Sequence, residues 1–173
     1  MRIPLIAGNW KMFKTNPEAV ELVGGLSPLV EGMQGVDIAI CPPFTSLSDV
    51  SRLLADLGSR MALGAQNVYP RNEGAFTGEI SPPMLKAVGV TYVIVGHSER
   101  REILGEDDEL VAAKVRAVLD EGMTPILCVG ETLEEREAGK AFGKVEKQLE
   151  ADLAGVSAEE AAGMVVAYEP IWA

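Results

Sequence analysis

The chain has 173 residues, and 47% of them are hydrophobic, which is enough for one domain with a substantial apolar core. It carries 15 basic and 26 acidic side chains, so its formal net charge is −11 and nucleic acid is disfavoured as a partner. The same charge repels small anionic substrates in general, so a site for one must supply its own positive potential.

The apolar runs of the chain are short. MVVAY and YVIV are far too short to span a bilayer, and the N-terminal MRIPLIAGNW lacks the long apolar region and cleavage site of a secretory signal. We therefore expect a cytoplasmic protein with no membrane partner. Cys41 and Cys128 each lie at the end of an apolar run, which favours buried, reduced thiols. With one histidine and two separated cysteines, the sequence offers no metal-ligand spacing.

Six short apolar runs recur along the chain, and helical patterns lie between them. The runs are IPLIAG (3–8), VDIAIC (36–41), MALGAQ (61–66), YVIVG (92–96), MTPILCVG (123–130) and MVVAY (164–168). They are apolar throughout rather than alternating, a pattern typical of parallel strands that helices cover on both faces.

The helical segments have apolar stripes and recognisable ends. One stripe is Leu47, Val50, Leu53, Leu54 and Leu57, another is Val111, Val115, Val118 and Leu119, and a third is Ala138, Ala141, Phe142, Val145 and Leu149. Asn16-Pro17 and Ser81-Pro82 predict helix starts, with a capping side chain before a proline in the first turn. Thr132…Glu135 and Ser157…Glu160 predict capping boxes. Glycines at positions 58, 89, 122 and 155 mark helix ends.

Strands and helices alternate from one end of the chain to the other without a linker or a low-complexity segment. We therefore expect residues 1–173 to form a single α/β domain. The spacing alone is compatible with a doubly wound sheet or with a barrel. A G-x-G-x-x-G motif after the first strand, which would favour a nucleotide-binding sheet, is absent.

Polar side chains gather where three of the predicted strands end. Asn9 and Lys11 follow the first run, His97 follows the fourth and Glu169 follows the sixth. Chemistry in parallel α/β folds belongs at the carboxyl ends of the strands. The sequence therefore predicts a cation, an imidazole and carboxylates on one rim.

Each of these residues also has a purely structural interpretation. A lysine after a strand is usually solvated, and Glu99 can pair with Arg100 or Arg101 as structural ions do. A histidine after apolar residues is often a hydrogen-bonded interior group, but the Ser-Glu-Arg that follows His97 predicts a short helix whose positive end favours a neutral imidazole. Glu169 directly follows buried apolar surface, a position that suits a general base and equally a structural ion pair.

Four motifs, GNWKM, VGHSERR, ILCVGE and AYEPIWA, occur in this order, and together they resemble the triosephosphate isomerase family. Residues 65–81, AQNVYPRNEGAFTGEIS, are similar to the extended third loop of that family. The resemblance covers the whole chain. It implies a TIM (β/α)8-barrel fold with about six of the eight βα units present. It also implies interconversion of dihydroxyacetone phosphate and D-glyceraldehyde 3-phosphate through an enediolate, in glycolysis and gluconeogenesis.

The resemblance also implies roles for single residues. Lys11 in GNWK would be the electrophilic cation beside the substrate oxygens, with Asn9 as a nearby polar contact. His97 in VGHSER would be the neutral imidazole that polarises the carbonyl group. Glu169 in AYEP would be the base that moves a proton between adjacent carbons.

Two further groups of residues take their expected roles from the same resemblance. Ser98 and Glu99 would help to hold the site. The segment 67–80 would project from the body into a second copy of the chain in a homodimer, with Thr77 at its tip and Phe76 and Glu79 beside it.

The chemistry of the three catalytic candidates agrees with these roles. Isomerising an aldose to a ketose through an enediolate needs a base at carbon, an electrophile at the two oxygens and a positive environment. Glutamate, histidine and lysine are that set. The reaction calls for no metal and no redox cofactor, so we expect none.

The sequence contains elements similar to only the first six of the family's eight strands. The lid that would begin at Pro170, the last two strands and the phosphate-binding loops have no counterpart, so we expect little isomerase activity from the 173 residues alone. One alternative is a chain that only assembles or binds. Another is a different (β/α)-barrel enzyme for a small phosphorylated substrate, which would have to share three separate motifs by coincidence.

Overall fold

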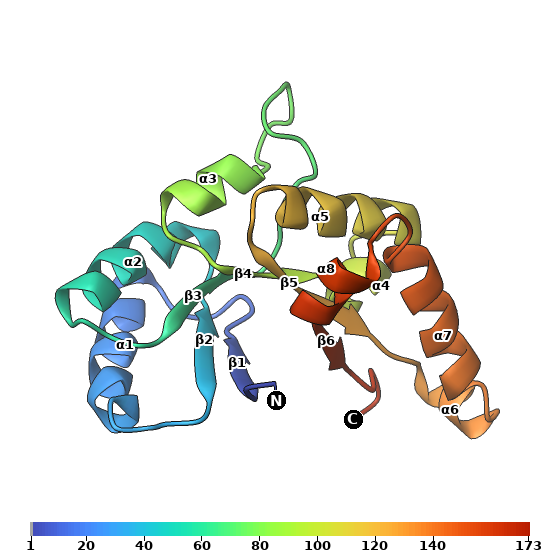
Figure 1. The fold of residues 1–173 in the computed structure, drawn as a ribbon, viewed down its shortest axis with the longest axis horizontal. Coiled ribbons are helices and arrows are strands. Elements are labelled where there is room, and N and C mark those ends of the chain that lie inside the picture. Colours follow the sequence, from blue (N-terminus) through green and yellow to red (C-terminus); the bar gives the residue numbers. More distant parts are fainter. Residues whose placement is uncertain (1) are drawn as a thin grey trace. The chain divides into compact units, whose positions relative to one another are not determined.

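The computed structural model describes residues 2–173, and the contacts between them divide the chain into two compact units. The first unit comprises residues up to Gln66 together with Pro83–Tyr92. The second comprises Asn67–Pro82 and Val93–Ala173. Figure 1 shows the alternation of strands and helices within each of them.

The first unit is built on three parallel strands in chain order, β1 (Leu5–Asn9), β2 (Asp37–Cys41) and β3 (Ala62–Ala65). The helices α1 (Asn16–Val30) and α2 (Leu47–Asp56) pack against each other beside the strands, and the short 3₁₀ helix η1 (Phe44–Ser46) leads into α2 (Figure 1). Most of α3 (Pro82–Ala87) also belongs here. Ala19 and Val23 of α1 and Val50 of α2 are fully buried, so these helices close the core of the unit.

The second unit contains β4 (Tyr92–Val95) from Val93 on, together with β5 (Thr124–Val129) and β6 (Val165–Tyr168), also in chain order. β5 and β6 are parallel, with Val129 opposite Tyr168. The helices are α4 (Ser98–Glu102), α5 (Asp108–Asp120), α6 (Leu133–Glu137), α7 (Ala141–Asp152) and α8 (Ala158–Gly163). α5 and α7 pack against each other and against β5 (Figure 1).

All six predicted strands are present, within one or two residues of the expected bounds at each end. The two capping boxes at Thr132 and Ser157 are confirmed. The first helix begins as expected at Asn16, but its N-cap is Thr15, whose backbone N–H donates to Glu18. Pro82 does begin α3, whereas the buried Ser81 hydroxyl has no hydrogen-bond partner among the described residues, so the predicted cap bond at Ser81 is wrong.

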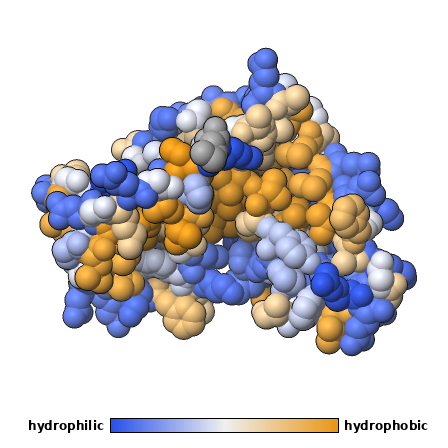
Figure 2. Space-filling model, turned by 60° about the horizontal axis from the view of Figure 1, so that its bottom comes forward, coloured by the Kyte–Doolittle hydropathy of each residue, from blue (hydrophilic) through white to orange (hydrophobic). Residues whose placement is uncertain are grey.

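β1 and β6 differ from the other strands, because they are not covered on both faces. Ile6 of β1 is 63% exposed, and Val166 and Tyr168 of β6 are about half exposed. β1 pairs only with β2 and β6 only with β5 within the described part of the chain, so each has one neighbouring strand where β2 has two. Figure 2 shows exposed hydrophobic residues as orange patches on the face that it draws.

The third predicted apolar stripe is also wrong as a buried face. The helix expected across Ala138 is broken there, because Gly139 adopts a left-handed backbone with φ of 69° between α6 and α7. Phe142 is 87% exposed, and with Val145 and Leu149 it lines an open groove beside β6. The two fully buried residues of α7 are polar, Gln148 and Asp152.

Candidate functional site

The centre of the candidate site lies where β4 ends. Gly96 turns the chain out of the strand with φ of 69°, and its space is bounded by the Arg101 guanidinium, 2.7 Å from where a Cβ would lie. His97 follows as the N-cap of α4, and its Nδ1 accepts a hydrogen bond from the backbone N–H of Glu99 at 3.2 Å. A ring nitrogen that accepts carries no proton, so this contact places the proton of a neutral His97 on Nε2.

Glu169 reaches the same place from β6. Its backbone N–H continues the ladder by donating to the Val129 carbonyl at 2.8 Å. Its carboxylate Oε1 lies 3.2 Å from His97 Nε2 and accepts a hydrogen bond from the Ser98 hydroxyl at 3.0 Å. The structure therefore brings His97, Ser98 and Glu169 together, as the rule for strand ends predicts.

The imidazole is more deeply buried than the two carboxylates beside it. The His97 side chain is only 10% exposed, whereas the Glu169 and Glu99 side chains are 30% and 45% exposed. Glu99 Oε2 also lies 3.5 Å from His97 Nδ1. The imidazole is thus fixed from two sides, while the Glu169 carboxylate keeps an open side toward solvent.

Glu169 is also shaped by a residue that the strand-end rule does not identify. Gly130 follows β5, and a Cβ at this position would lie 1.8 Å from the Glu169 carbonyl oxygen. No side chain fits there without displacing the backbone of Glu169. Gly130 stands within the quoted motif ILCVGE, but no local pattern indicates its contact with Glu169, which lies far along the chain.

Asn9 and Lys11 lie in the first unit, at the end of β1. Lys11 has a left-handed backbone with φ of 53°, which is uncommon for a residue with a side chain. Its N–H donates to Asn9 Oδ1 at 3.0 Å, and its carbonyl accepts from Gln66 Nε2 at 3.0 Å. The Gln66 amide also donates to the Cys41 carbonyl, so it ties Lys11 to the end of β2.

Gln66 was not among the predicted site residues. The signal was available, because Gln66 is the polar residue that ends the third apolar run, just as Asn9 ends the first. Its role differs from the one expected at such positions: the amide binds the backbone around Lys11.

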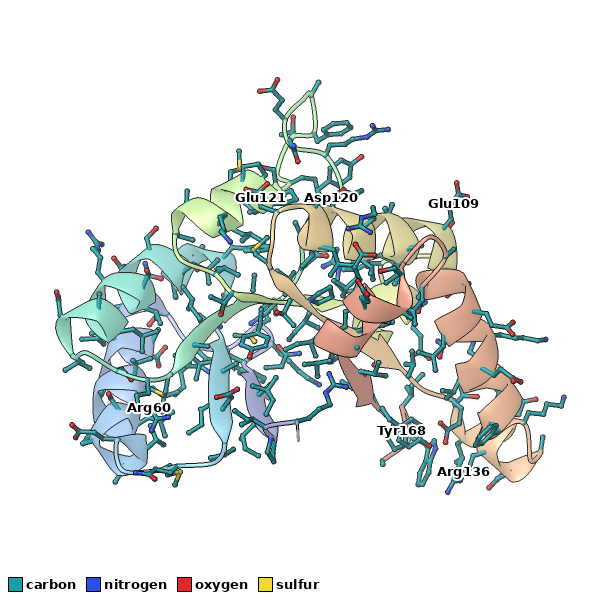
Figure 3. The ribbon with its side chains drawn as sticks, in the orientation of Figure 1. Arg60, Glu109, Asp120, Glu121, Arg136 and Tyr168 are labelled. Atoms are coloured by element: carbon teal, nitrogen blue, oxygen red, sulfur yellow. The ribbon has the colours of Figure 1, made fainter. Side chains whose placement is uncertain are left out.

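A second buried carboxylate lies next to the segment after β6. Glu131 is fully buried and accepts hydrogen bonds from the Tyr168 hydroxyl at 2.9 Å and from Trp172 Nε1 at 3.1 Å. Arg136 lies 3.6 Å from the same carboxylate and over the Trp172 ring, and Figure 3 shows Arg136 and Tyr168 in the same region of this unit. Burial by itself raises the pKa of Glu131, but the two hydrogen bonds and the arginine charge outweigh it and lower that pKa overall.

The predicted dimer loop is an ordered, exposed segment of the second unit. It extends away from the helices of that unit (Figure 1), and residues 71–79 are all exposed, including Phe76, Thr77 and Glu79. The Tyr69 N–H donates to the Ile80 carbonyl at 2.9 Å and closes the base of the loop. The Tyr69 and Phe76 rings lie 4.4 Å apart, so the loop packs on its own side chains.

The base of this loop is held by a buried ionic cluster. Lys114 of α5 is 2% exposed and donates to Asn67 at 2.7 Å and to Glu106 at 2.5 Å. Arg100 of α4 donates to the same Glu106 oxygen at 2.5 Å. Burial lowers the pKa of Lys114, an effect that the bond to Glu106 opposes. The loop is thus joined to the helix that carries His97 at its start.

Among residues 2–173, no group of three or more histidine, cysteine, aspartate or glutamate side chains is placed to hold a metal ion. None of the described helices is long and apolar enough to cross a membrane.

The arrangement at the ends of β4 and β6 is suited to proton transfer. A carboxylate with an open side lies within hydrogen-bond distance of an imidazole whose free N–H is on Nε2. The carboxylate can accept a proton from carbon, and the imidazole can donate a hydrogen bond to a neighbouring oxygen.

The chain matches a family model described as triosephosphate isomerase over residues 4–173. A triosephosphate isomerase of Symbiobacterium thermophilum is 54% identical over 173 residues, which is all of this chain and 67% of the relative. One of Fusobacterium nucleatum is also 54% identical, with 68% of the relative covered. One of a Roseiflexus species is 55% identical, with 67% covered. The resemblance seen in the motifs is confirmed, and with it the fold class of a (β/α)-barrel family with about six of its units.

Proposed function

Because the chain belongs to the triosephosphate isomerase family, we propose that it interconverts dihydroxyacetone phosphate and D-glyceraldehyde 3-phosphate. The observation that carries the proposal is the contact between Glu169 Oε1 and His97 Nε2, 3.2 Å apart at the ends of two strands. A base and a hydrogen-bond donor at this separation can act on a carbon and on the oxygen bonded to the next carbon.

In this reaction Glu169 takes a proton from the carbon beside the carbonyl group and returns it to the neighbouring carbon. The Nε2–H of His97 donates to the carbonyl oxygen and stabilises the negative charge that develops there. As the double bond moves, this oxygen gains a proton and the neighbouring hydroxyl loses one, and the imidazole passes that proton between the two oxygens. The Glu169 carboxylate accepts from the Ser98 hydroxyl at 3.0 Å, so it exchanges this hydrogen bond for contact with substrate carbon when it acts. Ser98 thereby sets the resting position of the base.

Lys11 supplies positive charge for the substrate. The net charge of the chain is −11, so a triose phosphate has to be attracted by local cations. The left-handed backbone of Lys11, held by Asn9 and Gln66, fixes the direction in which its side chain leaves β1. Asn9 acts on substrate binding through this backbone contact as well as through its own amide.

The reaction moves hydrogen within one molecule, so its chemistry needs no redox cofactor. We propose that the reaction serves glycolysis and gluconeogenesis and that the protein is located in the cytoplasm. Residues 1–173 form one partial (β/α)-barrel domain in this proposal.

We also propose that the active assembly is a homodimer in which the loop 67–80 docks on a second copy. The exposed aromatic ring of Phe76 and the exposed Thr77 lie on a loop that is ordered by its own contacts, which lowers the entropy cost of docking. Sedimentation at micromolar concentration should give a dimer mass, and replacing residues 72–78 by Gly-Ser should give a monomer. A dimer that survives this replacement would contradict the role of the loop.

Residues 1–173 span about two thirds of the length of the relatives that they match. We propose that these residues alone have little isomerase activity, because Val166 and Tyr168 of β6 and Phe142 of α7 are exposed to water in this chain. The chain alone therefore lacks part of the packing that would hold β6 and its base in place. Supplying the part of the Symbiobacterium thermophilum relative that the chain does not match should restore turnover.

The test is to assay isomerisation in both directions with this complemented assembly, for the wild-type chain, Glu169→Gln and Glu150→Gln. Glu150 is an exposed carboxylate on α7, so its variant controls for the loss of one charge. We expect Glu169→Gln to lower kcat by at least about a hundredfold and Glu150→Gln to change it by less than about twofold. Equal activity of all three chains would overturn the proposal. An assembly that forms but never turns over would favour a chain that only assembles or binds.

A further inference from the structure

Helix α7 buries two polar residues, and nothing in the proposed reaction uses them. Gln148 is 4% exposed and Asp152 is fully buried, and they lie four residues apart, on one face of the helix. The apolar residues Phe142, Val145 and Leu149 line an open groove instead. Hydrophobic burial does not explain why the residues that α7 buries are these two polar ones while Phe142 is exposed.

Gln148 is connected to the base, Glu169, through backbone hydrogen bonds. Its Oε1 accepts a hydrogen bond from the Gly130 N–H at 3.0 Å. The carbonyl groups on either side of Gly130 accept from the segment that carries the base: Val129 from the Glu169 N–H at 2.8 Å and Glu131 from the Ile171 N–H at 3.1 Å. Gly130 also lies directly against the Glu169 carbonyl. Gln148 therefore fixes the peptide on which the backbone of Glu169 rests.

Asp152 is connected to the backbone before the His97 imidazole through Arg101. Its Oδ2 accepts from the Arg101 guanidinium at 2.6 Å, and Arg101 Nε donates to the Gly96 carbonyl at 2.7 Å. The Gly96 carbonyl belongs to the peptide that joins Gly96 to His97. Arg101 also donates to Asp108 at 2.5 Å, so the guanidinium is held at both ends. Asp152 therefore fixes, through Arg101, the turn that presents His97.

Residues from both hydrogen-bond paths line one small cavity. Among them are Gly96 and Arg101 from the path through Asp152, and Gly130, Gln148 and Glu169 from the other. The two paths therefore border the same space.

The arrangement carries a cost in stability. Burial raises the pKa of Asp152 to about 6, although Arg101 opposes the effect, and Asp152 Oδ1 has no hydrogen-bond partner among the described residues. Buried ion pairs of this kind are often no more stabilising than apolar residues of the same volume. The polar pair is therefore better explained by the positions of the groups that it binds than by stability.

We propose that Gln148 and Asp152 are positioning residues: from one face of α7 they hold the strand end that carries Glu169 and the strand end that carries His97 in fixed relation to each other. Neither residue touches substrate in this role. The catalytic meaning of the inference rests on the proposed function, whereas the positioning itself does not.

His97 is the only histidine of the chain, so its imidazole gives a single reporter in a ¹H–¹⁵N spectrum when this chain alone is labelled. The complemented assembly is compared for the wild-type chain, Gln148→Met, Asp152→Leu and Asp152→Asn. The first two variants remove the acceptor, and Asp152→Asn keeps an oxygen for Arg101. Lys147→Met is the matched control, because Lys147 is an exposed neighbour on the same helix.

We expect Gln148→Met and Asp152→Leu to shift the His97 imidazole signals and to lower kcat by about tenfold to a hundredfold with little change in KM. Asp152→Asn should restore most of both, and Lys147→Met should match the wild type. Unshifted signals and unchanged kcat in the first two variants would overturn the proposal. So would a loss of folding that Asp152→Asn shares with Asp152→Leu, because the residues would then be structural only. If no chain turns over, the proposed function fails, and the imidazole signals still decide the positioning.

Discussion

Gly130 shows how a single residue without a side chain can define a catalytic position. The Glu169 carbonyl occupies the space that any Cβ at Gly130 would fill, with a separation of 1.8 Å. Real contacts at this distance do not occur, so a larger residue has to push the segment after β6 away from β5. The displaced residue would be the proposed base.

Gly130→Ala should therefore lower kcat by about a hundredfold or more, because displacements of the order of 1 Å at a reacting group cost that much. The matched control is Gly143→Ala on α7, where a Cβ meets nothing within 4 Å. That change should raise the free energy of unfolding by about 0.5–1 kcal/mol, as expected for glycine to alanine inside a helix. Steady-state kinetics and urea unfolding of both variants give the comparison. Normal turnover by Gly130→Ala would show that the base does not depend on this contact.

At the level of single residues, the sequence predicted the candidate catalytic residues better than the residues that position them. His97 and Glu169 were found because polar residues at the ends of apolar strands stand out in one dimension. Gln66 and Gly130 act through contacts with distant backbone, Gln66 with Lys11 and Gly130 with Glu169. Such contacts depend on the register of strands that are far apart in the sequence, so no local pattern predicts them.

Helix α7 shows the same limit at the level of an element. Its apolar stripe was correctly recognised as periodic, but periodicity does not say which face is covered. In the second unit α7 packs against α5 and β5 with Gln148 and Asp152 inward. The buried face of the helix is therefore the one that carries the hydrogen bonds to Gly130 and Arg101, and the apolar stripe is not the buried face.

The buried carboxyl of α7 predicts a dependence of stability on pH. Burial raises the pKa of Asp152 to about 6 from 3.8, with the charge of Arg101 opposing this and that of Asp108 adding to it. Because the folded pKa is higher than the unfolded one, the stabilising contribution is complete below about pH 4 and is lost as the pH rises through about 6.

The thermal midpoint of the wild-type chain, measured relative to that of Asp152→Asn, should therefore fall between about pH 4 and pH 6 and level off above. Asparagine does not titrate, so the difference isolates this carboxyl from the other acidic groups. A difference that stays constant across the range would mean that Asp152 is ionised throughout.

For the whole molecule, the family was evident from motifs that are short but ordered. GNWKM, VGHSERR, ILCVGE and AYEPIWA lie at strand ends in the structure, and each combines the end of a strand with a polar group that follows it. The alternation of strands and helices followed from the apolar runs. The exposure of β1 and β6 followed from the match to only the first six of the family's eight strands, because the apolar runs themselves do not say whether a strand has one neighbour or two.

The most direct test of the central claim is to run the isomerisation in D₂O with the complemented assembly and to measure deuterium at carbon by ¹H NMR. Proton transfer by Glu169 through an enediolate predicts that the recovered triose phosphates carry solvent deuterium at the carbons between which the proton moves. It also predicts that Glu169→Gln abolishes both this label and turnover. Product that forms at an undiminished rate in Glu169→Gln, or that carries no deuterium in any chain, would contradict the claim.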